Sequence, residues 1–149
     1  MAGWDVVRVN GGIYDLPNDP ALRQKVGYLN RSKVDVAVEL HLNGGQGTYS
    51  TAIYWDDAEK GVHSNQGKQL ADQFKLILPW QSRGARPMSW FDRGGLYFLE
   101  KTKMPAIIVE PGFRDTPAHK AFWEKRNGPV LYATMVYQGL ELYAREVLA

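Results

Sequence analysis

The sequence of 149 residues contains no cysteine, which excludes disulfide bonds, thiolate metal ligands and cysteine nucleophiles. Histidine is scarce, with three copies, so a bound metal ion would take its ligands from these residues and from Asp or Glu. No apolar run approaches the roughly 18 residues that cross a bilayer, which predicts no membrane span. Residues 1–15 also lack the basic start and apolar stretch of a secretory signal peptide.

The sequence also lacks a large excess of charge of one sign. Its 18 Lys and Arg residues nearly balance 16 Asp and Glu residues, which gives a formal net charge of +2. That small excess does not favour nucleic acid as a partner, although it is compatible with a polyanionic bacterial cell wall. The hydrophobic content of 44% and the charged content of 23% are typical of globular domains. Without a linker, repeat or low-complexity tract, residues 1–149 are expected to form one domain.

The spacing of apolar residues predicts strands that alternate with helices. Strands are expected where β-branched and apolar residues cluster or alternate, at residues 6–9, 34–42, 51–55 and 106–109. Helices are expected at residues 20–29, 64–78, 116–123 and 129–148. Residues 83–93 are predicted to be irregular, and residues 96–99 fit either type. The alternation favours an α/β fold with a single, mainly parallel sheet and helices on both faces.

One histidine and one glutamate stand at the ends of predicted strands. His41 closes the run V-D-V-A-V-E-L-H-L, and Glu110 follows the buried run A-I-I-V. Ligands of open α/β sheets bind beyond the carboxyl ends of the strands, so both side chains should face one rim if these strands are neighbours. Each also has an ordinary interpretation, since a lone His is often structural and a carboxylate after a strand often caps a turn.

The sequence motifs around His41 and Glu110 resemble those of a known enzyme family. The segments V-D-V-A-V-E-L-H-L-N-G-G and M-P-A-I-I-V-E-P-G-F-R-D-T-P are similar to the second metal-ligand motif and the catalytic strand of zinc-dependent N-acetylmuramoyl-L-alanine amidases. G-K-Q-L-A-D-Q-F resembles that family's central helix, and V-V-R-V followed by L-R-Q-K-V-G-Y-L-N resembles its second strand and helix. The matching segments follow one another in the family's order from Trp4 to Tyr143. V-E-P-G-F is the most specific of these motifs.

The resemblance implies an amidase-like or zinc-carboxypeptidase-like fold and a cell-wall hydrolase of the kind found among endolysins. Such enzymes hydrolyse the amide between N-acetylmuramic acid and L-alanine, so peptidoglycan is the expected partner. His41 would be a zinc ligand and Glu110 the catalytic general acid and base. Zinc would lower the pKa of a bound water to about 7 and polarise the carbonyl.

The family has two further metal ligands, a His after the first strand and a Glu on the first helix, which the sequence does not show. Relative to the family, the domain is therefore expected to be shortened by one strand and one helix. Glu39 is the best substitute ligand, because it shares a strand face with His41. The alternative is a degenerate relative that binds peptidoglycan without cutting it. A sheet edge exposed by the missing strand would allow two copies to pair.

Several other residues are candidates for contacts with wall fragments. By the resemblance, Asn43 follows the metal-ligand His, and the loop arginines Arg86 and Arg93 suit carboxylates or phosphates. The adjacent Trp90 and Phe91 could stack on sugar rings.

The remaining candidates are weaker. His63 and His119 are not expected to be metal ligands. A nucleotide-binding α/β domain is a poor fit, because the glycine pairs at 11–12 and 44–45 match no phosphate-binding motif. Without a signal peptide, action on the wall would require delivery from the cytoplasm by phage lysis machinery, or a native start that this sequence lacks.

Overall fold

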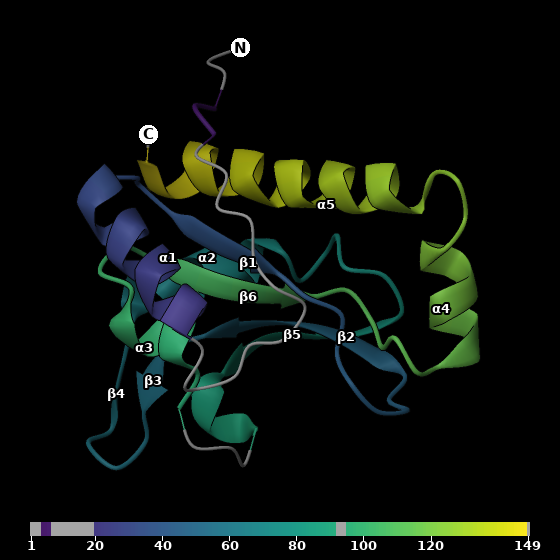
Figure 1. Ribbon diagram of the computed structural model, residues 1–149, viewed down its shortest axis with the longest axis horizontal. Coiled ribbons are helices and arrows are strands. Elements are labelled where there is room, and N and C mark those ends of the chain that lie inside the picture. Colours follow the sequence, from purple (N-terminus) through teal and green to yellow (C-terminus); the bar gives the residue numbers. More distant parts are fainter. Residues whose placement is uncertain (1–3, 7–19, 92–94, 149) are drawn as a thin grey trace.

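The structure is a computed structural model that describes residues 4–6, 20–91 and 95–148. Within these ranges, its main sheet has four strands in the order β1-β6-β2-β5 (Figure 1). β1 runs parallel to β6 and β2 parallel to β5, whereas β2 is antiparallel to β6. The strands span Ala37–Leu40 (β1), Tyr49–Tyr54 (β2), Gln81–Pro87 (β5) and Ala106–Glu110 (β6).

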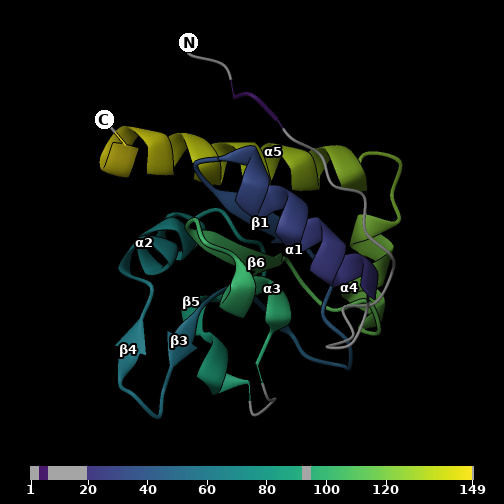
Figure 2. The same ribbon diagram turned by 60° about the vertical axis from the view of Figure 1, so that its left-hand side comes forward.

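Helices cover both faces of this sheet, and Figure 2 shows α1 and α2 on opposite sides of it. One face packs against α2 (Asn65–Gln73) and α5 (Gly128–Tyr143). The other packs against α1 (Pro20–Ser32) and α3 (Tyr97–Lys101). Successive residues of β6 point to opposite faces, so Ile107 and Val109 lie in the first core, and Ala106 and Ile108 in the second. The predicted α/β architecture is confirmed.

The predicted helix faces are confirmed, although one helix end is wrong. Leu22 and Val26 of α1 are buried, as their spacing predicts. Ser64 caps α2 by accepting a hydrogen bond from the Gly67 N–H at 2.9 Å. The helix ends at Gln73 rather than at residue 78, because the Phe74 N–H bonds to the Ala71 carbonyl and the chain tightens into turns.

The prediction of an irregular segment at residues 83–93 is wrong for residues 83–87, because residues 81–87 form the strand β5 at the edge of the described sheet; residues 92–94 lie outside the described residues. Its sequence, Q-S-R-G-A-R-P, lacks apolar alternation, and a register shift interrupts its pairing with β2 between Ser50 and Ala52. Gly84 has a φ of +67° near this irregularity, a backbone conformation that glycine adopts without strain. The predicted strand at 34–42 is also shorter, since β1 has four residues.

The remaining elements connect these layers. They are the short ribbon of β3 (Asp56–Asp57) and β4 (Val62–His63), the 3₁₀ turn η1 (Met88–Trp90), α4 (Pro117–Trp123) and the π-helical turn η2 (Ala144–Leu148). The strand predicted at residues 6–9 lies outside the described residues except for Val6, which is exposed. Of the helices in the described ranges, none is both long and apolar enough to cross a bilayer.

Candidate active site

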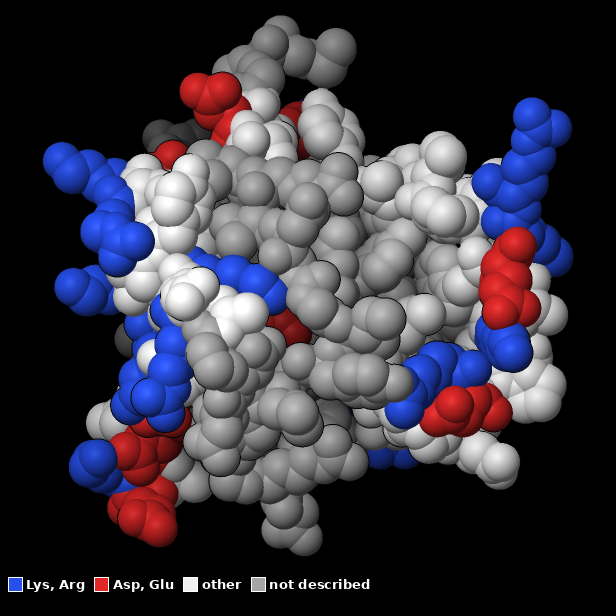
Figure 3. Space-filling model, in the orientation of Figure 1, with Lys and Arg blue, Asp and Glu red and all other residues white. Residues whose placement is uncertain are grey.

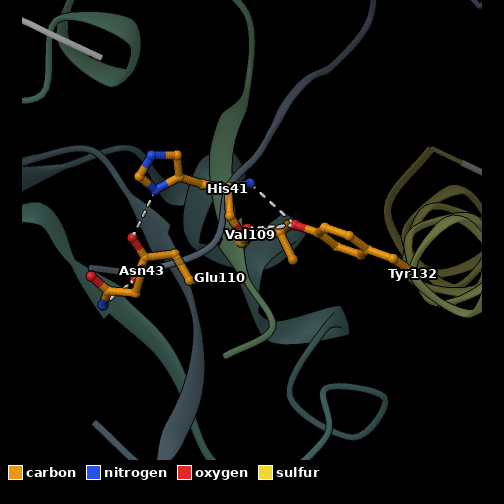
Figure 4. A network of polar contacts seen from close by, with 5 residues as sticks. All are labelled: His41, Asn43, Val109, Glu110 and Tyr132. Atoms are coloured by element: carbon orange, nitrogen blue, oxygen red, sulfur yellow. Dashed lines mark hydrogen bonds and ion pairs between the residues drawn. The ribbon is translucent and has the colours of Figure 1, made fainter. Parts of the chain in front are cut away.

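The two residues singled out at strand ends lie together. Glu110 is the last residue of β6, and His41 directly follows β1, with its N–H bonded to the Val109 carbonyl at 3.1 Å. Paired residues of parallel strands share a sheet face, so both side chains project to the same side. His41 Nδ1 lies 3.4 Å from Glu110 Oε1 (Figure 4). The Glu110 side chain is 9% exposed and that of His41 37%, so the pair lies at the rim with the carboxylate deeper.

Asn43 holds the second oxygen of the same carboxylate. Its side-chain amide donates to Glu110 Oε2 at 2.8 Å. The Asn43 backbone is fixed as well, because its N–H donates to the Gly112 carbonyl at 2.9 Å and its carbonyl accepts the Arg114 N–H at 3.0 Å. That Asn43 binds substrate stays a prediction; in the structure its amide occupies Oε2 and leaves Oε1 as the oxygen that faces His41.

Tyr132, which the sequence did not single out, contacts the backbone of the strand ends that carry His41 and Glu110. The Tyr132 hydroxyl of α5 donates to the Val109 carbonyl at 2.8 Å and lies 3.2 Å from the His41 backbone N–H (Figure 4). Burial raises the pKa of Tyr132 far above its ordinary value, and the carboxylates of Glu110 and Glu39 raise it further. The hydroxyl therefore stays protonated and remains a hydrogen-bond donor. No local signal in the sequence marks Tyr132, because it reaches the strand ends from a distant helix.

Contacts beyond the pair fix the two loops that form the rim. The Gly45 N–H donates to Asp115 Oδ2 at 2.8 Å, and the Thr116 hydroxyl donates to the Gly47 carbonyl at 2.7 Å. The hydrogen bond from the Gly45 N–H holds the pKa of Asp115 below its usual range, and the neighbouring Arg114 lowers that pKa by a smaller amount. The loop after β1 and the loop after β6 are thus joined across the end of the sheet.

The other candidate residues lie elsewhere. His63 is exposed on β4, and Arg93 lies outside the described residues. His119 is buried, accepts the Phe113 N–H on Nδ1 at 3.0 Å and stacks on Trp80 with ring centroids 4.0 Å apart. Burial lowers its pKa. His119 therefore packs and hydrogen-bonds within the fold.

The described residues do not assemble a complete zinc site. Glu39 precedes His41 on the same side of β1, where it pairs with Ile108 in the strand register. Among the residues that the structure describes, no group of three or more His, Cys, Asp or Glu side chains could hold a metal ion. His41 suits zinc as a donor, but a site with at least three protein ligands needs more than this one side chain.

Comparisons with known proteins give matches in sequence and in fold. The model of the N-acetylmuramoyl-L-alanine amidase family matches residues 10–142. A germination-specific N-acetylmuramoyl-L-alanine amidase of Bacillus subtilis (strain 168) is 25% identical over 126 residues, which cover 84% of this chain and 51% of that protein. The chain therefore spans about half the length of this relative.

Solved structures share the fold. The catalytic domain of an endolysin targeting Clostridia difficile superposes with a TM-score of 0.69 at 25% identity, covering 93% of this chain and 71% of that domain. The catalytic domain of the amidase CwlV from Bacillus (Paenibacillus) polymyxa superposes with a TM-score of 0.65 at 20% identity, covering 83% and 65%. The expected amidase-like architecture is thereby confirmed.

Proposed function

The chain belongs to the N-acetylmuramoyl-L-alanine amidase family, and from that premise we propose that it hydrolyses the amide bond between N-acetylmuramic acid and L-alanine in peptidoglycan. Its place of action would be the bacterial cell wall. The observation that carries the proposal is the convergence of His41 and Glu110, 3.4 Å apart at the ends of two neighbouring parallel strands. Ligands of open α/β sheets bind beyond the carboxyl ends of the strands, and a carboxylate positioned there can act as a general acid or base.

In this proposal Glu110 is the general base and then the general acid. Its Oε1 removes a proton from the water that attacks the carbonyl carbon, and the same carboxyl later delivers a proton to the leaving amine of alanine. Asn43 supports this role by binding Oε2 at 2.8 Å, which fixes the rotation of the carboxylate. Tyr132 supports it by tying the backbone of His41 to that of Val109. Zinc is the expected cofactor, with His41 among its ligands, while the proton transfers described here need Glu110 alone.

Substitution of Glu110 tests the catalytic role. Glu110→Gln keeps the side-chain shape but cannot take up a proton, so we expect release of alanine-terminated peptides from purified walls to fall at least about 100-fold. The thermal midpoint should change little. The matched control is Glu124→Gln, because Glu124 is exposed and forms a surface ion pair with Lys120 at 3.7 Å. Wild-type activity in Glu110→Gln would remove Glu110 from the catalytic role.

One observation favours a second candidate function, that of a relative that binds peptidoglycan without cutting it. Among the described residues, no group of three or more His, Cys, Asp or Glu side chains could hold a metal ion, and the carboxylate beside His41 is the one that the mechanism uses as its base. Metal analysis after incubation with zinc separates the candidates. Stoichiometric zinc together with cleavage supports the enzyme, and saturable wall binding without zinc or cleavage supports the binder. The pairing of two copies through a sheet edge stays a prediction.

A further inference from the structure

Two arginines of β5 lie against aromatic rings beside the candidate active site. The guanidinium carbon of Arg83 is 4.1 Å from the ring centroid of Tyr49 and 5.3 Å from that of Trp90. The guanidinium of Arg86 also lies 5.3 Å from Trp90, and the two rings meet edge to face at 6.0 Å. An arginine stacked in this way keeps its N–H groups available for a planar anion, because the ring occupies only its flat face.

The charges of these arginines are not matched by neighbouring carboxylates in the described ranges. Figure 3 shows Lys and Arg next to Asp or Glu at the left and right ends of the face in view. Elsewhere on the described surface, Lys68 pairs with Asp72 and Lys120 with Glu124. Within the described part of the chain, neither Arg83 nor Arg86 forms such a pair, and the buried Nε of Arg86 has no hydrogen-bond partner. No carboxylate of the described residues therefore offsets either charge, which leaves both arginines able to pair with an anionic ligand.

The turn that carries Trp90 is anchored to the rest of the fold. Asp56, which is 8% exposed, accepts the backbone N–H of Ser89 at 2.8 Å and also accepts the Ser89 hydroxyl. Trp90 follows directly within the same 3₁₀ turn. The aromatic support of the arginines is therefore set before any ligand arrives, which reduces the entropy lost on binding.

The register of the sheet places this cluster on the same face as Glu110. Arg86 pairs with Ile53 of β2, and Ile53 pairs with Ile108 of β6. Residues paired across neighbouring strands share a face, so Arg86 projects to the side of Ile108 and hence of Glu110. Two strand spacings separate β5 from β6, which gives about 10 Å. An extended peptide covers that distance with about three residues.

We infer that Arg83 and Arg86, supported by Tyr49 and Trp90, form a subsite for a carboxylate of the substrate's peptide arm, about three residues beyond the cleaved amide. The inference takes its location from the proposed amidase function and its chemistry from the two guanidinium groups. A carboxylate suits them because its two oxygens accept parallel N–H bonds from a guanidinium fork. The subsite would draw the peptide arm across β2 and place the amide over Glu110.

Calorimetric titration of the whole chain tests this inference without relying on catalysis. The probe is the N-acetylated tripeptide of L-alanine, γ-D-glutamate and L-lysine, compared with the same peptide amidated at every carboxylate. We expect the free acid to bind about tenfold more tightly at low salt, and Arg83→Met or Arg86→Met to remove about that factor. Arg83→Lys should keep part of it, because it retains the charge but loses the planar fork.

Arg23→Met is the matched control, since Arg23 is an exposed arginine that lies 5.7 Å from the Tyr97 ring on α3. Its affinity for the peptide should equal that of the wild type. Equal binding of the amidated peptide, wild-type affinity in both methionine variants, or no binding of the peptide would overturn the subsite. So would arginine-dependent binding of a glycerol-phosphate polymer alone. Loss of cleavage in Glu110→Gln with intact peptide binding keeps this result separate from the test of the amidase function.

Discussion

Removal of the Tyr132 hydroxyl should destabilise the protein, because that group joins α5 to the ends of β1 and β6. In Tyr132→Phe the Val109 carbonyl loses its donor at 2.8 Å, and the His41 N–H loses its second acceptor at 3.2 Å. The ring itself remains packed near Trp123, with centroids 5.6 Å apart in the wild type. The substitution therefore isolates the hydrogen bonds from the aromatic packing.

The structure sets the size of this effect. A buried carbonyl that loses every partner costs about 1–3 kcal/mol. The Val109 carbonyl keeps the His41 N–H at 3.1 Å, so we expect the lower part of that range, about 1–2 kcal/mol. For a chain of this length, that loss lowers the thermal midpoint by roughly 3–8 °C.

Thermal unfolding followed by circular dichroism measures the difference. Tyr137→Phe is the matched control, because Tyr137 lies on the same helix with 47% of its surface exposed and should leave the midpoint unchanged. A midpoint for Tyr132→Phe within 1 °C of the wild type would refute the argument, because the hydroxyl would then contribute nothing to stability. An equal loss in both variants would refute it too, by assigning the effect to the helix surface.

Two further predictions concern packing and pH. In Gly139→Ala the new Cβ would lie 2.6 Å from ring atoms of the fully buried Phe74. Overpacking costs about 1–3 kcal/mol, which outweighs a gain in helix propensity of about 1 kcal/mol. We therefore expect the free energy of unfolding, measured by urea denaturation, to fall by about 1 kcal/mol. A more stable variant would contradict this. Because burial lowers the pKa of His119, the unfolded chain binds its proton first, so stability is complete above about pH 6.5 and falls as the solution is acidified. His119→Asn should flatten that part of the midpoint's pH dependence, and an unchanged slope would exclude His119 as its source.

The fold was predictable where apolar spacing is strong. The helix with Leu22 and Val26 and the strand that ends at Glu110 follow directly from their periodicity. β5 was missed because Arg83, Gly84 and Arg86 interrupt any alternation, and pairing with the apolar β2 creates this strand instead. Tertiary pairing of this kind leaves no local pattern.

Some residues of the candidate site could be predicted from the sequence and others could not. His41 and Glu110 were expected at one rim because each follows a strand, and the register of β1 with β6 places them together. Tyr132 could not be predicted, because it contacts that rim through the packing of α5, 91 residues from His41 in sequence. Arg83 was missed for a related reason, since its partner Tyr49 lies on another strand. The roles of these residues stay predictions until the variants are measured.

The position of β6 between β1 and β2 constrains how the chain can fold during synthesis. β1 and β2 follow one another in sequence, yet they flank a strand made of Ala106–Glu110 and share no ladder of their own. A nascent chain that ends before residue 106 has both neighbours but nothing to join them. β1 therefore cannot be joined to β2 and β5 until residues 106–110 have left the ribosome, and such distant contacts make folding slow. Until then, the edges of β1 and β2 that β6 will cover are exposed to other chains, which makes this interval the one in which a chaperone would matter most.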